Sequence, residues 1–238
     1  MNQSSRFGAI ADNGKSVGEQ ITDTLRKAII LRRLRLGERL VESKLAAELN
    51  VSITPVRYAF QILASEGLIE VFPYKGSYVT TITRAFIKDI CVCRSIVELG
   101  AAEHAYEVLA EKNSGALMQL LMEGVEAFKR TGDIMEVIAK DQLFHKTVLM
   151  HCPFRTLLDF WKRLSPRIML LQSYAKRESY DVNQFRERHL PLAEALARKA
   201  GKEVFVDALR ENLEMSYSEE EIRIILEEAG QVADAVSR

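Results

Sequence analysis

Apolar residues recur every three or four positions in three segments between residues 17 and 66. This spacing is typical of helices with one buried face, and the predicted helices are Val17–Leu31, Glu42–Leu49 and Ile53–Glu66. Asn50 stands where the chain must turn sharply, and Asn tolerates the left-handed conformation of such a turn. Pro55 falls in the first turn of a helix, where its missing N–H does no harm. The stretch Leu45–Arg57 is therefore predicted to be a helix-turn-helix.

The pattern changes after Gly67. Leu68–Phe72 and Ser77–Thr81 are predicted to be strands, because they are rich in β-branched and aromatic residues and flank the turn Pro73–Gly76. They form a hairpin with Lys75 at its tip. A helix-turn-helix followed by a hairpin is a winged helix, which places one helix in the major groove of DNA and the wing along the backbone or in the minor groove.

From residue 85 onward the strand pattern disappears, and glycine and proline are scarce. Six further helices are predicted, at Ala85–Glu111, Ser114–Arg130, Asp133–His151, Phe154–Lys176, Val182–Ala200 and Lys202–Glu228. Their connecting loops are short, so successive helices run antiparallel. The predicted fold class is mostly α, with an N-terminal winged helix-turn-helix and a C-terminal all-α antiparallel helical bundle.

These elements divide the 238 residues into two domains and two tails. Residues 1–15 are expected to be a disordered tail and residues 16–82 the winged helix-turn-helix domain. Residues 83–229 are expected to be the helical domain and residues 230–238 a frayed end. No apolar run approaches the ~20 residues of a membrane-spanning helix, so no membrane partner is expected.

Charge and cysteine content agree with this division. The formal net charge is zero, but residues 1–83 carry a net charge of +3 and residues 84–238 a net charge of −3. A basic first domain fits contact with DNA, although an asymmetry of this size does not establish it. The cysteines are an odd and sparse set, which favours a reducing, cytoplasmic compartment over a disulfide framework; they are Cys91, Cys93 and Cys152.

Asp141 and His145 form the most informative pair in the helical region. They are four residues apart, so both side chains leave the same face of the predicted helix. A carboxylate and an imidazole together suit a divalent metal ion such as zinc. The spacing alone also fits a local ion pair or a solvated face, and both interpretations stay open.

The run from Leu36 to Val79, LGERLVESKLAAELNVSITPVRYAFQILASEGLIEVFPYKGSYV, resembles the winged-helix head of GntR-type bacterial transcription regulators. The resemblance implies six residues that contact DNA: Ser43, Ser52, Thr54, Arg57, Lys75 and Gly76. Two positions depart from the family pattern, because Ile53 stands where Arg is usual and Tyr58 where Glu is usual. Ile cannot hydrogen-bond guanine as Arg does, so more of the sequence reading is expected to fall to Arg57 and the wing.

Residues 86–225 resemble the FCD domain, the all-helical ligand-binding domain of the FadR subfamily of these regulators. The matching segments are Arg94–Ala102, Asp141–His145 and Arg188–Leu196. Metal-binding members hold a divalent cation with one Asp and three His, which implies the ligands Asp141, His145, His189 and, at or next to the fourth position, Asn212. An Asn oxygen is a weaker zinc ligand than an imidazole. Two possibilities follow: a divalent metal, zinc or similar, with Asn212 in its site, or a pocket that binds an effector directly.

The resemblance also makes Arg94 a candidate for binding an effector, because a guanidinium can hold a carboxylate by two parallel hydrogen bonds. The alternative for Arg94 is an ion pair with Glu98, one helical turn further along. Arg167 is a weaker candidate for the same role, and an ordinary surface position is its alternative.

The leading hypothesis is a sequence-specific DNA-binding transcriptional regulator. A small carboxylate effector, an organic or sugar acid, would control its affinity for the operator, and two-fold DNA sites favour a homodimer. A metal-dependent hydrolase or isomerase that uses Asp141, His145 and His189 is a rival. The sequence has no nucleophile motif and no glycine-rich phosphate loop, so an enzyme is not expected. A pure metal sensor is a second rival.

Overall fold

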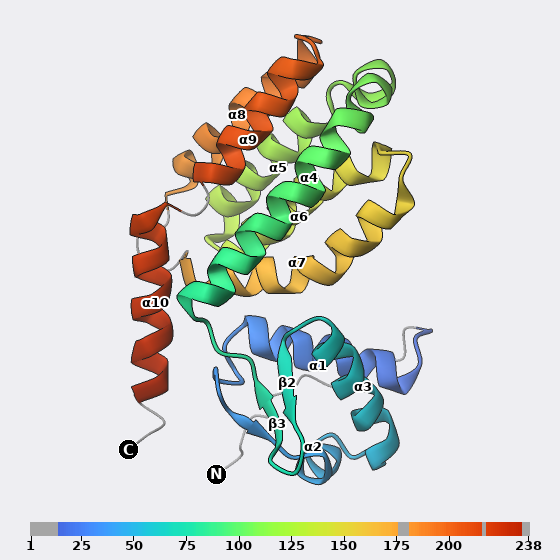
Figure 1. The fold of residues 1–238 in the computed structure, drawn as a ribbon, viewed down its shortest axis with the longest axis vertical. Coiled ribbons are helices and arrows are strands. Elements are labelled where there is room, and N and C mark those ends of the chain that lie inside the picture. The colour runs from blue at the N-terminus through green and yellow to red at the C-terminus, as the bar shows by residue number, and fades with distance from the viewer. Residues whose placement is uncertain (1–13, 176–180, 216–217, 235–238) are drawn as a thin grey trace. The chain divides into compact units, whose positions relative to one another are not determined.

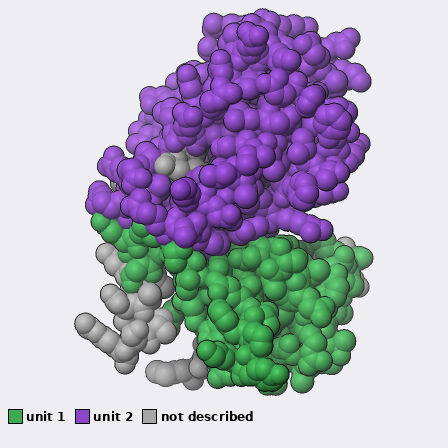
Figure 2. All heavy atoms as spheres, viewed as in Figure 1, with its two compact units in different colours: residues 1–83, 226–238 green, residues 84–225 purple. Residues whose placement is uncertain are grey.

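The computed structural model of the chain describes residues 14–175, 181–215 and 218–234. It contains two compact units, residues 1–83 with 226–238 and residues 84–225, which Figure 2 shows in different colours. Most of the tail expected at residues 1–15 lies outside the described residues, as do the last four residues of the chain. Among the described helices, none combines the length and the apolar character that crossing a membrane requires.

Within residues 14–83, the first unit contains three helices: α1 (Val17–Ile30), α2 (Glu42–Glu48) and α3 (Ile53–Ser65) (Figure 1). Each agrees with its predicted helix to within one residue. α1 packs against α3, and their inward side chains are fully buried, as Ile21 and Leu63 illustrate. Asn50 has a φ of 54°, which confirms the left-handed turn expected between α2 and α3.

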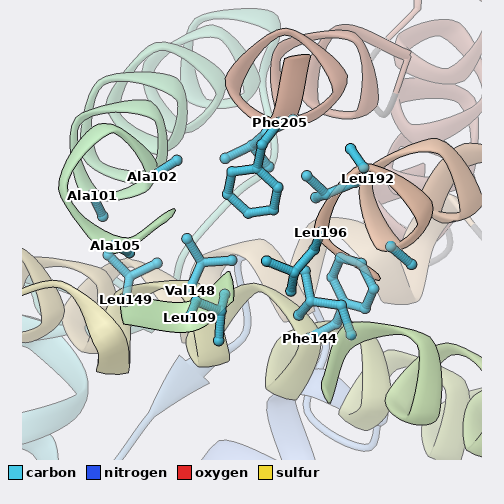
Figure 3. Close-up of a cluster of buried hydrophobic side chains, with 14 of the residues drawn as sticks. Ala101, Ala102, Ala105, Leu109, Phe144, Val148, Leu149, Leu192, Leu196 and Phe205 are labelled. Atoms are coloured by element: carbon cyan, nitrogen blue, oxygen red, sulfur yellow. The ribbon is translucent and has the colours of Figure 1, made fainter. Parts of the chain in front are cut away.

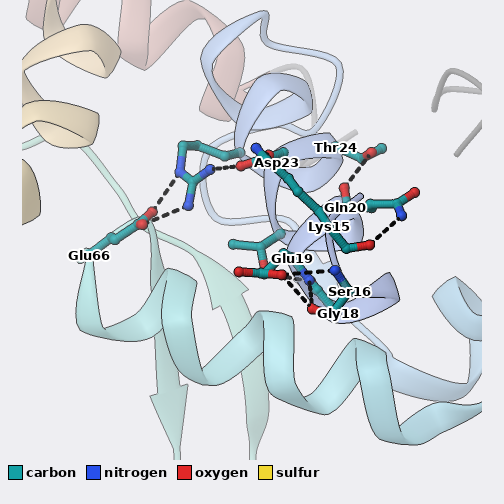
Figure 4. A network of polar contacts seen from close by, with 10 residues as sticks. Lys15, Ser16, Gly18, Glu19, Gln20, Asp23, Thr24 and Glu66 are labelled. Atoms are coloured by element: carbon teal, nitrogen blue, oxygen red, sulfur yellow. Dashed lines mark hydrogen bonds and ion pairs between the residues drawn. The ribbon is translucent and has the colours of Figure 1, made fainter. Parts of the chain in front are cut away.

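Polar contacts fix α1 at both ends (Figure 4). At its start, the Ser16 hydroxyl accepts a hydrogen bond from the backbone N–H of Glu19, whose carboxylate accepts one from the backbone N–H of Ser16. This reciprocal pair is a capping box. Further along, Arg26 donates to both carboxylate oxygens of Glu66, at 2.8 and 2.7 Å, and to Asp23. Glu66 follows the last residue of α3, so this bidentate pair ties the two helices together.

The wing is a three-stranded antiparallel sheet with the order β1-β3-β2. Strands β2 (Ile69–Phe72) and β3 (Gly76–Val79) form the predicted hairpin. Strand β1 (Arg39–Leu40) lies on the other side of β3, where Arg39 pairs with Tyr78. The sequence did not predict β1, because two residues are too few to show an alternating pattern. As a result, the segment before α2 is part of the wing.

The described residues between 84 and 215, in the second unit, form six helices: α4 (Arg84–Asn113), α5 (Ala116–Thr131), α6 (Ile134–His151), α7 (Arg155–Ala175), α8 (Val182–Ala197) and α9 (Lys202–Met215). α4 packs against α6, α7 and α9, and α5 packs against α6 and α8. Figure 3 shows part of the core between them, a cluster of buried side chains that includes Phe144, Phe205 and several alanines of α4. The predicted fold class is confirmed.

Two helices of this unit contain an internal proline, Pro166 in α7 and Pro191 in α8. A proline has no N–H, so the carbonyl four residues earlier receives no helical hydrogen bond from it. Pro191 lies two residues after His189, on the helix that was expected to supply a metal ligand.

The single helix predicted at Lys202–Glu228 is wrong, because α9 ends at Met215 and a separate helix, α10, spans Glu219–Asp234. The Ser218 hydroxyl accepts a hydrogen bond from the backbone N–H of Glu221. Three glutamates follow in the first turn, and both features favour a helix start. α10 includes residues 230–234, part of the stretch expected to be frayed, because one internal glycine costs a helix only about 1 kcal/mol.

Candidate nucleic-acid interface and metal centre

The residues predicted to contact DNA come from three elements of the first unit. All are exposed except the half-buried Gly76: Ser43 in α2, Ser52, Thr54 and Arg57 at the start of α3, and Lys75 and Gly76 in the wing. Ser52 precedes α3 without capping it through its side chain. Its hydroxyl is therefore not committed to the helix end.

A hollow of about 340 Å³ lies on this unit where β1, α2, α3 and β3 meet. We call it the head hollow, and its polar lining consists of Arg39, Glu42, Ser43, Arg57, Gly76 and Ser77. Three of these residues were predicted to contact DNA, and the hollow brings them together although they are up to 33 positions apart. Ile53 also lines it, whereas the other three predicted residues lie outside its lining.

Arg57 forms an ion pair with Glu42 across the head hollow. Its Nε and one terminal nitrogen both lie 3.1 Å from the same Glu42 oxygen. The Arg57 side chain is 64% exposed and that of Glu42 is 32% exposed. Exposed pairs of this kind contribute about 0–1 kcal/mol to stability, so Arg57 can exchange Glu42 for another anion at little cost.

The second unit brings three predicted metal ligands together in its interior. Asp141 and His145 come from α6 and His189 comes from α8, and their potential ligand atoms all lie within 4.8 Å of one another. Each of the three residues is at most 3% exposed. The i, i+4 spacing thus produced a buried cluster rather than a solvated face, and one carboxylate with two imidazoles is a donor set for zinc and similar ions.

Both imidazoles are held by their Nδ1 atoms. Nδ1 of His189 lies 2.7 Å from the backbone carbonyl oxygen of Phe185, and Nδ1 of His145 lies 2.7 Å from a carboxylate oxygen of Glu98. Contacts of this kind orient metal-ligating histidines and direct the Nε2 atom to the ion. Nε2 of His145 is buried and has no hydrogen-bond partner within the described residues. A buried imidazole nitrogen without a hydrogen-bond partner fits a site in which that nitrogen binds a metal ion.

Asp141 and His189 are already spaced as metal ligands would be. Nε2 of His189 lies 3.0 Å from one Asp141 oxygen, and Gln172 donates a hydrogen bond of 2.5 Å to the other. Two ligands on a tetrahedral zinc ion are about 3.3 Å apart, given bonds of about 2.0–2.1 Å. Burial lowers the pKa of His189 and outweighs the opposing effect of Asp141, which favours the neutral imidazole that metals require.

Glu98 connects the cluster to two further side chains. One Glu98 oxygen accepts two hydrogen bonds, from Nε of Arg94 at 2.8 Å and from Nε1 of Trp161 at 2.9 Å, and the other oxygen contacts His145. Burial alone raises the pKa of Glu98, but Arg94 and His145 outweigh this effect and lower the pKa to about 2. Glu98 is therefore a buried carboxylate anion that joins α4, α6 and α7.

Asn212 lies beside α8 in the interior, only 1% exposed. Its side-chain nitrogen donates a hydrogen bond of 2.9 Å to the backbone carbonyl of Arg188, the residue before His189. Because the nitrogen is used in this way, the amide oxygen is the atom through which Asn212 can act as a ligand.

The two arginines predicted to bind an effector differ in their positions. Arg94 is 2% exposed and forms the ion pair with Glu98, so the alternative raised for it is present in the structure. Arg94 contacts Glu98, and Glu98 contacts His145, so one residue separates Arg94 from the cluster. Arg167 lies 3.8 Å from Asp89, and the structure does not place it with the cluster. An effector role for either arginine stays a prediction.

Sequence reasoning missed several residues of these sites. The sequence suggested Glu98 only as a partner of Arg94. Its contact with His145 joins residues that are 47 positions apart on two different helices, so it leaves no local pattern. Gln172 and Trp161 were missed for the same reason. Arg39 was missed because β1 was not predicted, and its only signal was its place inside the family-like run, two residues after Gly37.

Two family models match the chain. The model described as "Bacterial regulatory proteins, gntR family" matches residues 17–79, and the model of the FCD domain matches residues 89–215. The Gluconate operon transcriptional repressor of Bacillus licheniformis is 30% identical over 207 residues, which cover 84% of this chain and 83% of that protein.

Other relatives lead to the same families. The HTH-type transcriptional repressor RspR of Escherichia coli is 27% identical over 207 residues, or 87% of this chain and 90% of that protein. Among solved structures, E. coli McbR/YncC superposes with a TM-score of 0.70 at 25% identity and covers 90% of this chain and 98% of that one.

Proposed function

Because the chain belongs to the GntR family of bacterial transcription regulators and carries an FCD domain, we propose that a small carboxylate bound in its second unit controls how tightly it binds its operator. The relatives are transcriptional regulators and not enzymes, which confirms the function class predicted from the sequence. The proposal concerns the signal that the regulator receives and the residues that receive it.

The buried Asp141–His145–His189 cluster carries this proposal. Three protein ligands leave positions on a divalent cation that a further ligand can fill. A carboxylate is a suitable ligand for such an ion, and the ion would supply the positive charge that holds it. Among this chain's own residues, Glu98 and the Phe185 carbonyl orient the two imidazoles, and Gln172 orients Asp141.

Organic and sugar acids are the effectors to test first. The B. licheniformis relative is named for the gluconate operon, and gluconate is a sugar acid. Its carboxylate could join the metal while its hydroxyl groups bond to polar side chains. Gln142 is one such side chain, because it is buried and hydrogen-bonded to Gln172 and Ser165 beside the cluster.

We further propose that the regulator acts as a homodimer on a two-fold operator, since winged heads of this kind read paired half-sites. An effector can shift the equilibrium between DNA-binding and non-binding states only as far as its affinities for the two states differ. The same coupling free energy must make DNA weaken or strengthen effector binding, which gives a reciprocal test.

The chain contains a built-in reporter for this test. Trp161 is its single tryptophan, and it is hydrogen-bonded to the carboxylate that contacts His145. The experiment begins with full-length protein stripped by a chelator and reloaded with Zn²⁺ or Mn²⁺. Gluconate, citrate and related acids are then added, and Trp161 fluorescence and thermal melting are recorded. DNA affinity is measured on a duplex that the wild-type protein enriches from a randomised library.

We expect at least one acid to change both the Trp161 signal and the DNA affinity of the metal-loaded protein. His189→Gln should lose both responses while retaining basal DNA binding. If metal alone changes DNA affinity and no acid adds to the change, the regulator is a metal sensor. If the acids act equally on stripped and loaded protein, the metal has no part in the response.

A further inference from the structure

We propose that the head hollow seats one phosphate group of the DNA backbone and that Arg39, on β1, is the cation that completes this seat. Neither the sequence pattern nor the family resemblance assigned Arg39 a role. The inference rests on DNA binding by the first unit but not on any effector or metal in the second.

Arg39 is held over the turn of the wing. It is exposed, and its backbone pairs with Tyr78 of β3. A Cβ added to Gly76 would lie 3.4 Å from Nε of Arg39 and 3.6 Å from one of its terminal nitrogens. Gly76 also has a φ of +105°, which residues with side chains rarely adopt. Such distances are ordinary van der Waals contacts, so it is the φ of Gly76 and not a lack of space that favours glycine there, and the Arg39 guanidinium lies directly beside this turn.

The lining of the head hollow matches the chemistry of a phosphate. It contains two guanidinium groups, from Arg39 and Arg57, and two hydroxyl groups, from Ser43 and Ser77. Guanidinium groups bind phosphate through paired, parallel hydrogen bonds. The volume of about 340 Å³ is roughly ten times the ~30 Å³ that one water molecule occupies in the liquid. A solvated phosphodiester can therefore enter without repacking the protein.

The two arginines differ in what they contact before DNA arrives. Arg57 is paired with Glu42, which is the one carboxylate among the described residues that line the hollow. Arg39 has no ion pair with any residue that the structure describes, so its charge is uncompensated at short range. A phosphate in the hollow would meet Arg39 directly, whereas Arg57 first has to leave Glu42, which costs little because that exposed pair is weak, and is then available for sequence reading.

A phosphate contact by Arg39 would change the salt dependence of DNA affinity by a known amount. Each phosphate neutralised by a protein cation contributes about −0.9 to the slope of log affinity against log salt concentration. Backbone contacts also act equally on all sequences, whereas base contacts act on the preferred sequence alone. The test therefore uses full-length protein with two duplexes of equal length: one enriched from a randomised library by the wild-type protein, and one with the same base composition in shuffled order.

Arg39→Ala should weaken binding to both duplexes by the same factor and should reduce the salt slope by about 0.9. The advantage of wild type over the variant then shrinks about 3.5-fold between 50 and 200 mM salt. Lys27→Ala is the matched control, because it removes one exposed charge on α1, outside the lining of the hollow. Arg39→Lys should keep the slope while losing part of the affinity, since it retains the charge without the planar fork.

Several results would overturn the assignment. One is that Arg39→Ala equals Lys27→Ala in affinity and slope on both duplexes. Another is a loss confined to the enriched duplex, which would make Arg39 a base-reading residue. If Arg39→Ala melts at a lower temperature than wild type, its loss of affinity can come from unfolding, and Arg39→Lys is used instead. A changed salt slope in Arg39→Lys would contradict the phosphate contact. Failure of the wild-type protein to enrich any duplex from the library would instead contradict DNA binding itself.

Discussion

One arginine–glutamate pair in each unit has the same chemistry but different surroundings. In the first unit, Arg57 and Glu42 have side chains that are 64% and 32% exposed. In the second unit, Arg94 and Glu98 have side chains that are 2% and 0% exposed. The sequence suggested an anionic ligand for both arginines, DNA for Arg57 and an effector carboxylate for Arg94.

Burial decides what each pair can do. An exposed pair contributes about 0–1 kcal/mol, so its arginine can leave one anion for another. Breaking a buried pair costs about 3–5 kcal/mol, because it leaves an uncompensated charge in the interior. Arg57 is therefore suited to exchange between Glu42 and DNA, whereas Arg94 is suited to keep Glu98 ionised and in place against His145.

The largest expected effect comes from removing the carboxylate of each pair. Glu98→Ala should lower the free energy of unfolding of the second unit by about 3–5 kcal/mol, because Arg94 and Trp161 lose their acceptor in the interior. Glu42→Ala, the matched variant in the first unit, should change stability by less than about 1 kcal/mol. Urea unfolding followed by circular dichroism measures both. Equal losses in the two variants would show that burial does not separate the pairs.

The next effect concerns metal binding at the buried cluster. Zn²⁺ or Mn²⁺ at one hundred times its dissociation constant should stabilise chelator-treated protein by about 2.7 kcal/mol. Asp141→Ala should abolish this gain, whereas Asp159→Ala, which removes an exposed carboxylate on α7, should retain it. Thermal melting with and without metal measures the difference. A full gain in Asp141→Ala would place the bound ion elsewhere.

Arg57→Ala tests the exchangeable pair directly. We expect a loss of about 1–3 kcal/mol in binding to the enriched duplex, the range for an arginine that contacts DNA specifically. Stability should change by less than about 1 kcal/mol, since the pair with Glu42 is exposed. Fluorescence anisotropy with labelled duplex gives the affinity, and Lys27→Ala controls for the lost charge. An unchanged affinity would remove Arg57 from the interface.

The smallest expected effect is a gain of function at Asn212. Asn212→His supplies an imidazole in place of an amide, and we expect metal binding to tighten on the order of tenfold, or about 1.4 kcal/mol. Competition with a chelator of known affinity measures the change. Weaker binding in this variant would mean that the hydrogen bond from Asn212 to the Arg188 carbonyl matters more than the ligand atom it presents.

The sequence predicted what depends on short-range pattern. Helical periodicity located α1 to α8 closely, and the spacing of Asp141 and His145 placed both on one helix face. His189 entered only through the family resemblance, because no pattern along the chain connects α8 with α6. Without that resemblance, the sequence would have left open whether Asp141 and His145 are metal ligands or a local ion pair.

The remaining features depend on contacts that only folding creates. Glu98 contacts His145 because α4 packs against α6, and this pairing of helices has no signature in either segment. Strand β1 exists because Arg39 and Leu40 pair with β3, and two residues are too few for the sequence pattern to predict a strand. The break between α9 and α10 was missed because Ser218 resembles any other helix-surface serine until it caps a new helix.

Pro191 has a consequence for the rate at which a ligand can reach the buried cluster. Because Pro191 has no N–H, the main-chain ladder of α8 lacks one bond to the carbonyl of Glu187, within the turn that carries His189. Local opening costs least where such bonds are missing, so we expect α8 to open around His189 more readily than an uninterrupted helix would. Amide hydrogen exchange around residues 187–191 would measure how often this turn opens, and each opening would bring His189 closer to solvent and to an entering ligand.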